Sequence, residues 1–159
     1  MRDYDANFAA DVATHSLPSF SYVKGLTYKN EHPGYGTTVS QGAAFSTGIV
    51  SAVLASSLAD ETLVLITWDE GGGFFDHVTP PAASEVDQQP YGTRVPLIVA
   101  GRFARKGFVS HVTLEHSSVV ALVEYNFLHA SGQLGGRDAV VHNLGSLLDP
   151  AETGVVIPE

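Results

Sequence analysis

TLVLITWDEGGGFFDHVTPP, at residues 62–81, is the stretch of sequence that decides the fold. Its first part, residues 63–68, is an unbroken apolar and β-branched run, which is typical of a strand buried on both faces of a sheet. Two adjacent carboxylates, Asp69 and Glu70, follow where this strand ends. In open α/β sheets, ligands bind just beyond the carboxyl ends of the strands. The stretch therefore predicts a central strand that ends at a ligand site.

The acidic pair has two interpretations. Acidic residues after a strand are usually solvated, because charged side chains are mostly exposed. Three glycines follow at residues 71–73, however, and glycines in an ordered loop are favoured where the backbone turns sharply or approaches a ligand closely. Adjacent like charges repel each other unless a cation neutralises them, and carboxylate oxygens suit a hard divalent metal ion. We therefore interpret Asp69 and Glu70 as candidate metal ligands, with the identity of the metal ion left open.

Three further segments accompany this motif. Glu31-His32-Pro33 precedes it, GTRVPLIV follows at residues 92–99, and EHSSV lies at residues 115–119. Taken in this order with TWDEGGGFFDHVTPP, they resemble the phosphoesterase family of bacterial phospholipases C and acid phosphatases, within the alkaline phosphatase superfamily. The resemblance implies an α/β fold, namely a three-layer α/β/α sandwich with a mainly parallel sheet. Residues 1–159 would form the C-terminal half of one alkaline-phosphatase-like domain.

The resemblance also implies a function. The family hydrolyses phosphate esters with the help of a divalent metal ion, so the chain would come from a metal-dependent phosphoric ester hydrolase. Asp69 and Glu70 would hold part of the metal site, His32 and His77 would be catalytic, and His32 and His116 would contact the substrate. The substrate would be a phospholipid or a soluble phosphate monoester, and the sequence leaves its head group open.

Two expected parts of such an enzyme are not found in this sequence. Members of the family carry a Glu-Asn pair of metal ligands and a Ser or Thr nucleophile upstream of the matched region. We therefore expect the N-terminal half of the same enzyme to be the partner of this chain, and the isolated chain to be inactive. The alternative is a non-catalytic remnant that retains the fold and weak metal or phosphate binding. The resemblance places the parent enzyme outside the cytoplasm, secreted or periplasmic.

Composition narrows the function classes. The formal net charge of −9 argues against nucleic acid as a partner, because binding to a phosphate backbone requires a basic face. No apolar run approaches about 18 residues, so no transmembrane segment is predicted. The absence of cysteine excludes disulfides and thiolate metal sites. A chain of 159 residues with 44% hydrophobic and 16% charged residues suits one globular domain.

Hydrophobic periodicity predicts the remaining elements. We expect helices at residues 4–15, 38–57 and 113–129, and strands at residues 20–23, 63–68 and 95–100. The first strand, the second helix and the central strand would form a right-handed βαβ unit. His111 and His116 flank the start of the last helix, and five residues apart they do not share a helical face. Asp76 is expected at most to orient its neighbour His77.

Overall fold

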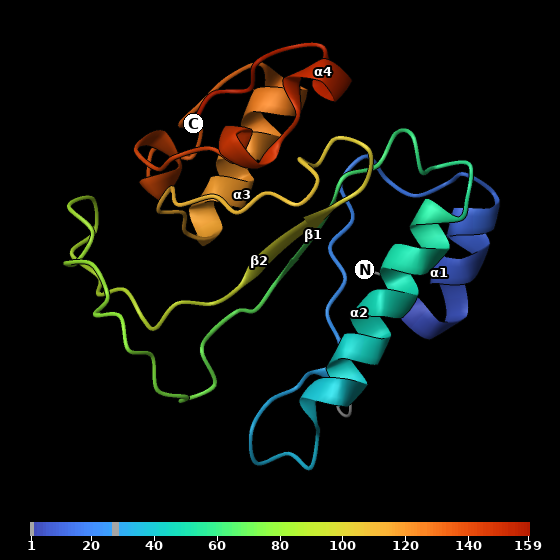
Figure 1. Cartoon of the computed structure of the whole chain (residues 1–159), viewed down its shortest axis with the longest axis horizontal. Helices are drawn as coiled ribbons and strands as arrows, with labels where there is room; N and C mark the ends of the chain where they lie inside the picture. Colours follow the sequence, from blue (N-terminus) through green and yellow to red (C-terminus); the bar gives the residue numbers. More distant parts are fainter. Residues whose placement is uncertain (1, 27–28) are drawn as a thin grey trace. The chain divides into compact units, whose positions relative to one another are not determined.

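The computed structural model describes residues 2–26 and 29–159 of the chain. The chain forms two compact units. Unit 1 comprises Met1–Ile66 and Ile98–Arg102, and unit 2 comprises Thr67–Leu97 and Phe103–Glu159. Figure 1 follows the chain from the N-terminus in blue to the C-terminus in red. In both units the described residues include buried apolar side chains, so each unit has a hydrophobic centre of its own.

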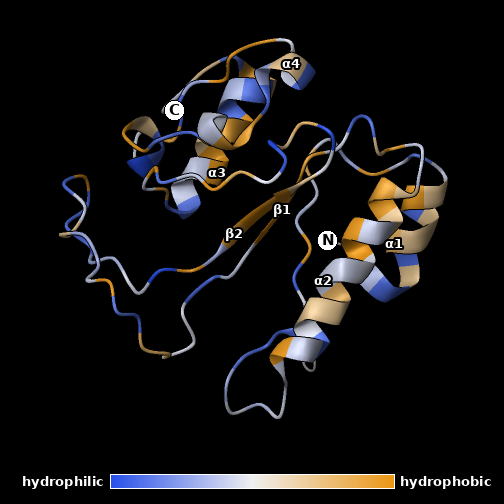
Figure 2. Ribbon diagram, in the orientation of Figure 1, coloured by the Kyte–Doolittle hydropathy of each residue, from blue (hydrophilic) through white to orange (hydrophobic). Residues whose placement is uncertain are grey.

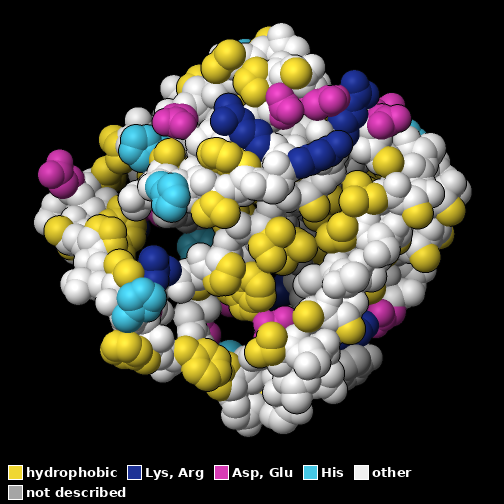
Figure 3. Space-filling model, in the orientation of Figure 1, with side chains coloured by type: hydrophobic (Ala, Val, Ile, Leu, Met, Phe, Trp, Pro, Cys, Tyr) yellow, Lys and Arg dark blue, Asp and Glu magenta, His cyan; other side chains and the backbone are white. Residues whose placement is uncertain are grey.

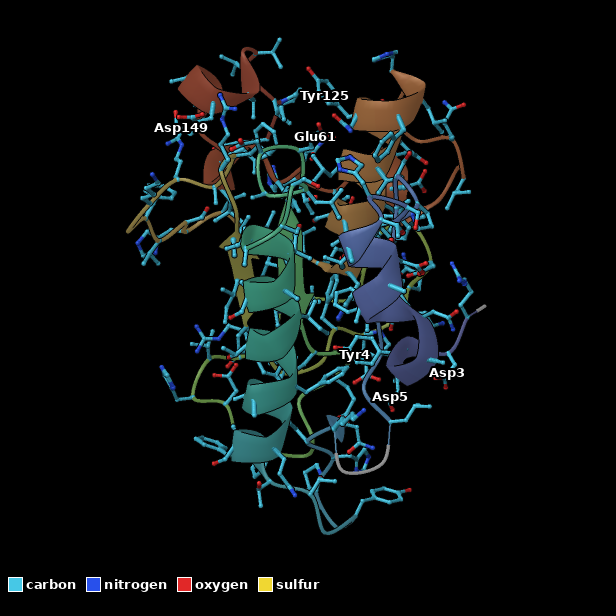
Figure 4. All side chains as sticks on the ribbon, turned by 90° about the vertical axis from the view of Figure 1, so that its right-hand side faces the viewer. Asp3, Tyr4, Asp5, Glu61, Tyr125 and Asp149 are labelled. Carbon is cyan, nitrogen blue, oxygen red and sulfur yellow. The ribbon has the colours of Figure 1, made fainter. Side chains whose placement is uncertain are left out.

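Unit 1 is built on two packed helices, α1 (Tyr4–Ala13) and α2 (Val39–Leu54). The helix predicted at residues 4–15 is confirmed as α1, and the one predicted at residues 38–57 as α2. Thr38 caps α2 in a capping box with Gln41, which satisfies backbone N–H groups that the first helical turn leaves unpaired. Tyr4, labelled in Figure 4, lies between the helices, with its ring 5.0 Å from that of Phe45.

The packed faces of these helices meet in a small apolar core. Its buried members are Val12, Val53 and Leu58, and Phe8, Leu17 and Val64 pack against them. Val12 and Val53 come from the two helices, and Val64 is the first residue of the strand that follows α2. The core therefore holds both helices against the strand that leads to the acidic turn.

The central strand is β1 (Val64–Thr67), and it pairs with β2 (Leu97–Ala100) in a sheet of two strands. Figure 2 shows the apolar character of both strands in orange. At one end the Thr67 hydroxyl donates to the Pro96 carbonyl at 2.9 Å, and at the other Gly101 lies against the Thr62 carbonyl. The end of one strand thus faces the start of the other, so the pair is antiparallel. The α/β class is supported, but this antiparallel pair does not confirm the mainly parallel sheet that the sequence led us to expect.

The strand predicted at residues 20–23 is wrong, because this segment is irregular in the structure. Phe20 and Tyr22 are 53% and 74% exposed, so the alternation of large side chains there does not reflect a buried face. Strand propensity measures how well side chains pack on a pleated surface, and it forms no strand without a partner. The predicted βαβ unit is therefore not present in the described residues. The three-layer sandwich stays a prediction.

Unit 2 is organised around α3 (His116–Val123), which continues into the π-helix Glu124–Leu128 and ends at His129 in a left-handed conformation. The helix predicted at residues 113–129 is thus found, but it begins later, because Glu115 is its N-cap. The short helices η3 (Arg137–Ala139), η4 (Gly145–Leu147) and α4 (Pro150–Thr153) complete the unit. Leu144 is fully buried. The C-terminal segment therefore belongs to the core of unit 2.

Many large apolar side chains are exposed, and Figure 3 shows them in yellow at many points of the visible face. Phe75 is 91% exposed and Phe74 66%. Large exposed apolar surface commonly marks a region that packs against another molecule or segment. Within residues 2–26 and 29–159, no helix has the length and apolar character needed to cross a membrane.

Candidate functional site

The turn after β1 takes its shape from its three glycines. The backbone N–H of Gly72 donates to Glu70 Oε2 at 2.6 Å, which orients the Glu70 carboxylate. Gly72 and Gly73 have φ angles of 65° and 72°, a region that residues with a Cβ atom disfavour. A Cβ atom on Gly71 would collide with the side chain of Thr93. The sharp turn that the sequence suggested for the glycines therefore occurs here, and the close approach that the structure shows is to the Thr93 side chain.

The acidic turn opens on a cavity of about 390 Å³ within unit 2. The cavity brings together the acidic turn, the segment that leads into β2, the first residues of α3 and one residue of η3. Its lining comprises Asp69, Glu70, Gly71, Gly73, Pro90, Tyr91, Gly92, Thr93, Val95, Glu115, His116, Ser117 and Arg137. Three predicted site residues, Asp69, Glu70 and His116, thus share one cavity, although His116 lies more than forty positions after the acidic pair in the sequence.

His116 is tied to the end of the central strand. Its Nε2 atom lies 2.8 Å from the Trp68 carbonyl oxygen. A carbonyl only accepts hydrogen bonds, so Nε2 carries the proton and Nδ1 of the neutral ring holds a lone pair. Because His116 is the first residue of α3, this bond fixes the start of α3 next to the residue that precedes Asp69. The ring can therefore accept a proton or a hydrogen bond at Nδ1.

Arg137 lies at the centre of a charged cluster in the cavity wall that sequence reasoning missed. Its guanidinium donates to both carboxylate oxygens of Asp87, at 2.8 and 2.9 Å, and lies 3.5 Å from Glu115. The bidentate bond to Arg137 lowers the pKa of Asp87 to about 2. Arg137 also stacks over the ring of Tyr91 at 4.8 Å, and a hydrogen bond to the Glu115 carboxylate raises the pKa of Tyr91. The sequence holds no local signal for this cluster, because Asp87 and Arg137 are 50 residues apart.

The main partner of Asp76 is Arg94 rather than His77, the neighbour that the sequence suggested. Its carboxylate accepts hydrogen bonds from Arg94 Nε and Nη2 at 2.9 and 2.8 Å, and from the backbone N–H groups of Arg94 and Val78, both at 3.0 Å. The His77 ring is 82% exposed, and its Nδ1 atom lies 3.9 Å from Asp76 Oδ1. Asp76 therefore fastens the glycine loop to the segment before β2. His77 lines neither this cavity nor a second one beside Phe74 and Phe75.

The Asp76–Arg94 pair leads to a prediction about pH. The Arg94 guanidinium beside Asp76 holds the pKa of that carboxyl far below its usual range. Since the pKa is lower in the folded state, the pair stabilises the fold fully above the unfolded value of about 4, and this stability is lost as pH falls through the folded pKa. Asp76→Asn is expected to lower the melting temperature at neutral pH and to match the unmodified chain more closely in acid. Thermal melts across the acid range measure this, and a difference that does not depend on pH would contradict it.

His32 belongs to unit 1, and its own loop holds its ring. The Nδ1 atom lies 2.7 Å from the Pro33 carbonyl oxygen, so Nδ1 carries the proton and Nε2 holds the lone pair of the neutral ring. The ring also meets Tyr35 edge-to-face, with ring centroids 4.6 Å apart. A histidine held through one nitrogen by a backbone carbonyl presents the other nitrogen in a defined direction, as in many metal and catalytic sites.

The donor set supplies only part of a metal site. Asp69 and Glu70 are hard oxygen ligands on one turn, as a divalent ion requires. Within residues 2–26 and 29–159, however, no three His, Asp or Glu side chains are grouped closely enough to hold a metal ion. The described residues thus do not complete a resident metal site by themselves.

Comparison with known proteins identifies the family. The sequence profile of the Phosphoesterase family matches residues 1–128. The chain belongs to this family. The matched region contains the His32 loop, the acidic turn and α3, and among the cavity-lining residues only Arg137 lies beyond it.

Several phospholipases C are similar to this chain. Phospholipase C B of Mycobacterium tuberculosis is 29% identical over 90% of this chain and 32% of its own length. Non-specific phospholipase C6 of Arabidopsis thaliana is 31% identical over 87% of this chain and 32% of its own length. Non-hemolytic phospholipase C of Pseudomonas aeruginosa is 30% identical over 74% of this chain and 21% of its own length. This phosphoesterase chain thus spans about a third or less of the length of these relatives.

Proposed function

We propose that the chain is the portion of a phosphate-ester hydrolase that supplies the second part of its active site. The observation that carries the proposal is the cavity in which Asp69 and Glu70 meet His116, in a chain of the Phosphoesterase family. The named relatives that support it are phospholipases C. The longer protein would then have the three-layer α/β/α sandwich, with residues 1–159 as the C-terminal half of one domain.

The charges in the cavity support a role for a cation. Three carboxylates line it, from Asp69, Glu70 and Glu115, against the single guanidinium of Arg137. Arg137 is already engaged by Asp87 and Glu115. An anionic phosphate would be repelled by this excess of negative charge unless a cation were bound. We therefore assign Asp69 and Glu70 as two ligands of a divalent metal ion, with the remaining ligands supplied from outside the described residues.

The histidines would act on the substrate itself. We assign His32 and His77 as catalytic residues, with His32 and His116 in contact with the phosphate group. When bound, a divalent ion would supply a Lewis-acid charge that stabilises the phosphoryl oxygens. His32 would present Nε2 and His116 would present Nδ1, because the other nitrogen of each ring donates to a backbone carbonyl. Each presented nitrogen would donate to a phosphate oxygen when its ring is protonated. The substrate would be a phospholipid, as in the named relatives, or a soluble phosphate monoester.

One observation favours the alternative, a non-catalytic remnant with weak metal or phosphate binding. Among the described residues, no three His, Asp or Glu side chains lie close enough together to hold a metal ion. A remnant of this kind would keep the cavity and lose turnover. The two proposals differ in what accompanies this chain, because only the enzyme requires a nucleophile and further ligands.

The deciding experiment compares this chain with an extended polypeptide, meaning the chain together with the in-frame region encoded upstream of it. Both are assayed against a generic phosphate monoester and a choline phosphodiester. Metal-dependent turnover by the extended polypeptide supports the hydrolase, and the preferred substrate separates the phospholipase C type from the acid phosphatase type. An upstream region without a Glu-Asn pair and a Ser or Thr nucleophile favours the remnant.

His32→Ala in the extended polypeptide is expected to slow turnover while the fold is retained. Nε2 would donate to the phosphate when the ring is protonated, and removing one donor that stabilises transition-state charge costs about 2.7–4 kcal/mol, or about 100- to 1,000-fold in kcat. The exposed ring contributes little to the core, so the melting temperature is expected to change little. Steady-state kinetics and a thermal melt on the same sample measure both effects. A large fall in melting temperature with turnover preserved in the folded fraction would show that His32 is structural.

A further inference from the structure

The loop that carries His32 rests on the first turns of α2. The side chain of Glu31 lies against Gly42, which is buried. A Cβ atom at position 42 would come within 2.5 Å of Glu31 Cδ and closer still to its neighbouring atoms, so only glycine leaves room for the Glu31 side chain. We call this contact at Gly42 the seat of the Glu31 side chain. In the sequence, Thr38 lies between Glu31 and Gly42, and it caps α2. The start of α2 therefore fixes where the Glu31 side chain lies.

The backbone of Glu31 is strained. Its φ angle is 60°, in the left-handed region, which residues other than glycine adopt uncommonly. Such conformations cost free energy, persist only where the surroundings enforce them, and concentrate at functional sites. The seat at Gly42 is an interaction that holds the side chain of this strained residue. Because Glu31 directly precedes His32, the backbone conformation of Glu31 sets the direction in which the backbone continues into His32.

Hydrogen bonds hold both backbone polar groups of His32 within the loop. The His32 backbone N–H donates to Asn30 Oδ1 at 2.9 Å, and the Thr37 hydroxyl donates to the His32 carbonyl at 2.9 Å. Within this frame Nδ1 donates to the Pro33 carbonyl at 2.7 Å. The Nδ1–H tautomer therefore depends on the loop keeping its shape. The loop in turn contacts α2 through the Glu31 side chain.

From this arrangement we infer that Glu31 is a positioning residue for His32, and that Gly42 is the seat that allows it to act. The inference rests on the proposed function, in which Nε2 of His32 faces the substrate phosphate. Glu31 does not touch the substrate. It holds the left-handed turn that places the His32 ring over the Pro33 carbonyl, which leaves Nε2 as the acceptor of the neutral ring. Displacing the Glu31 side chain releases the ring and lets the proton move to Nε2.

The test uses this chain and two glycines of the same helix. Gly42→Ala introduces a methyl group where the Glu31 side chain lies, whereas Gly48 has no atom within 4 Å of an added Cβ and is the matched control. Alanine favours a helix over glycine, so Gly48→Ala is expected to raise the melting temperature and to leave His32 unchanged. Gly42→Ala is expected to lower the melting temperature and to remove the Nδ1–H form of His32 as the major tautomer. Ring nitrogen-15 chemical shifts, recorded at alkaline pH where histidine is neutral, report the tautomer directly.

A second variant keeps the inference falsifiable if Gly42→Ala does not fold. Glu31→Ala removes the side chain that lies against Gly42 and leaves a residue that disfavours the positive φ angle, so α2 is expected to remain folded while His32 loses its preference for Nδ1–H. The inference is overturned if His32 keeps the Nδ1–H form in either variant. It is also overturned if Gly42→Ala behaves like Gly48→Ala, or if the unmodified chain does not show the Nδ1–H form. The tautomer of His32 is measured without any turnover. An inactive extended polypeptide would therefore contradict the proposed function, whereas the tautomer alone would decide whether Glu31 positions His32.

Discussion

Asp69→Asn is expected to abolish divalent-metal binding and phosphate-ester turnover in the extended polypeptide without unfolding it. Asp69 supplies one of the carboxylates that give the cavity its excess of negative charge. Changing a residue that merely supports a metal ligand costs about 10- to 100-fold in affinity or activity, so losing a charged ligand is expected to cost at least about 100-fold. Isothermal titration with a divalent metal ion measures the affinity, and a steady-state assay measures the turnover.

The matched control for Asp69→Asn is Glu85→Gln. Glu85 lies in the same unit, is exposed and lines neither cavity, and its substitution removes the same single negative charge. Glu85→Gln is expected to leave metal affinity and turnover unchanged. Equal effects of the two substitutions would mean that overall charge, rather than ligation, controls binding. Unchanged metal content in Asp69→Asn would show that the ligand assignment is wrong.

The sequence predicted those elements of the fold that depend on strong local patterns. The apolar run that becomes β1 and the capped, periodic segment that becomes α2 were both found. The segment at residues 20–23 has the same β-branched and aromatic character but no neighbour to pair with, and it stays irregular. A strand depends on its partner, whereas a capped helix satisfies its own backbone. Sequence patterns therefore located helices better than strands, and they did not give the antiparallel direction of β1 and β2.

The candidate site was predictable only where acidic or histidine residues lie next to the end of a strand or the start of a helix. Asp69 and Glu70 follow the end of a strand and His116 begins a helix, so their positions at element ends indicated a site. Arg137 and Tyr91 reach the same cavity through contacts that span long stretches of sequence, and no local pattern marks them.

The glycine loop shows a similar limit. Its sequence predicts a sharp turn, yet the residue that fastens the turn is Arg94, bound to Asp76 18 positions away. From residue type alone, an arginine such as Arg94 suits a solvated side chain as well as an ion pair. Spatial neighbours, rather than residue types, decide which of two such interpretations holds.

The last prediction is that the 159-residue chain alone does not hydrolyse phosphate esters, even when folded. The reason is that none of the hydroxyl groups that the structure describes in or near the cavity is placed as a nucleophile. Thr93 lies against Gly71, and Ser117 follows His116 in the first turn of α3. Neither lies on the strand-to-helix turn that typically exposes a nucleophile. The Thr67 hydroxyl donates to the Pro96 carbonyl, which makes it part of the sheet rather than of a reacting pair.

Metal binding by the chain alone is expected to be weak for the same reason. Two carboxylates leave most of the coordination sphere of a divalent ion to water, which keeps the affinity low. The purified chain is assayed with and without added divalent metal ions, alongside Asp69→Asn and Ser117→Ala. No turnover above that of buffer is expected from any of them. Turnover by the unmodified chain that disappears in Asp69→Asn would exclude a contaminant and overturn this prediction, and its loss in Ser117→Ala as well would identify Ser117 as the nucleophile.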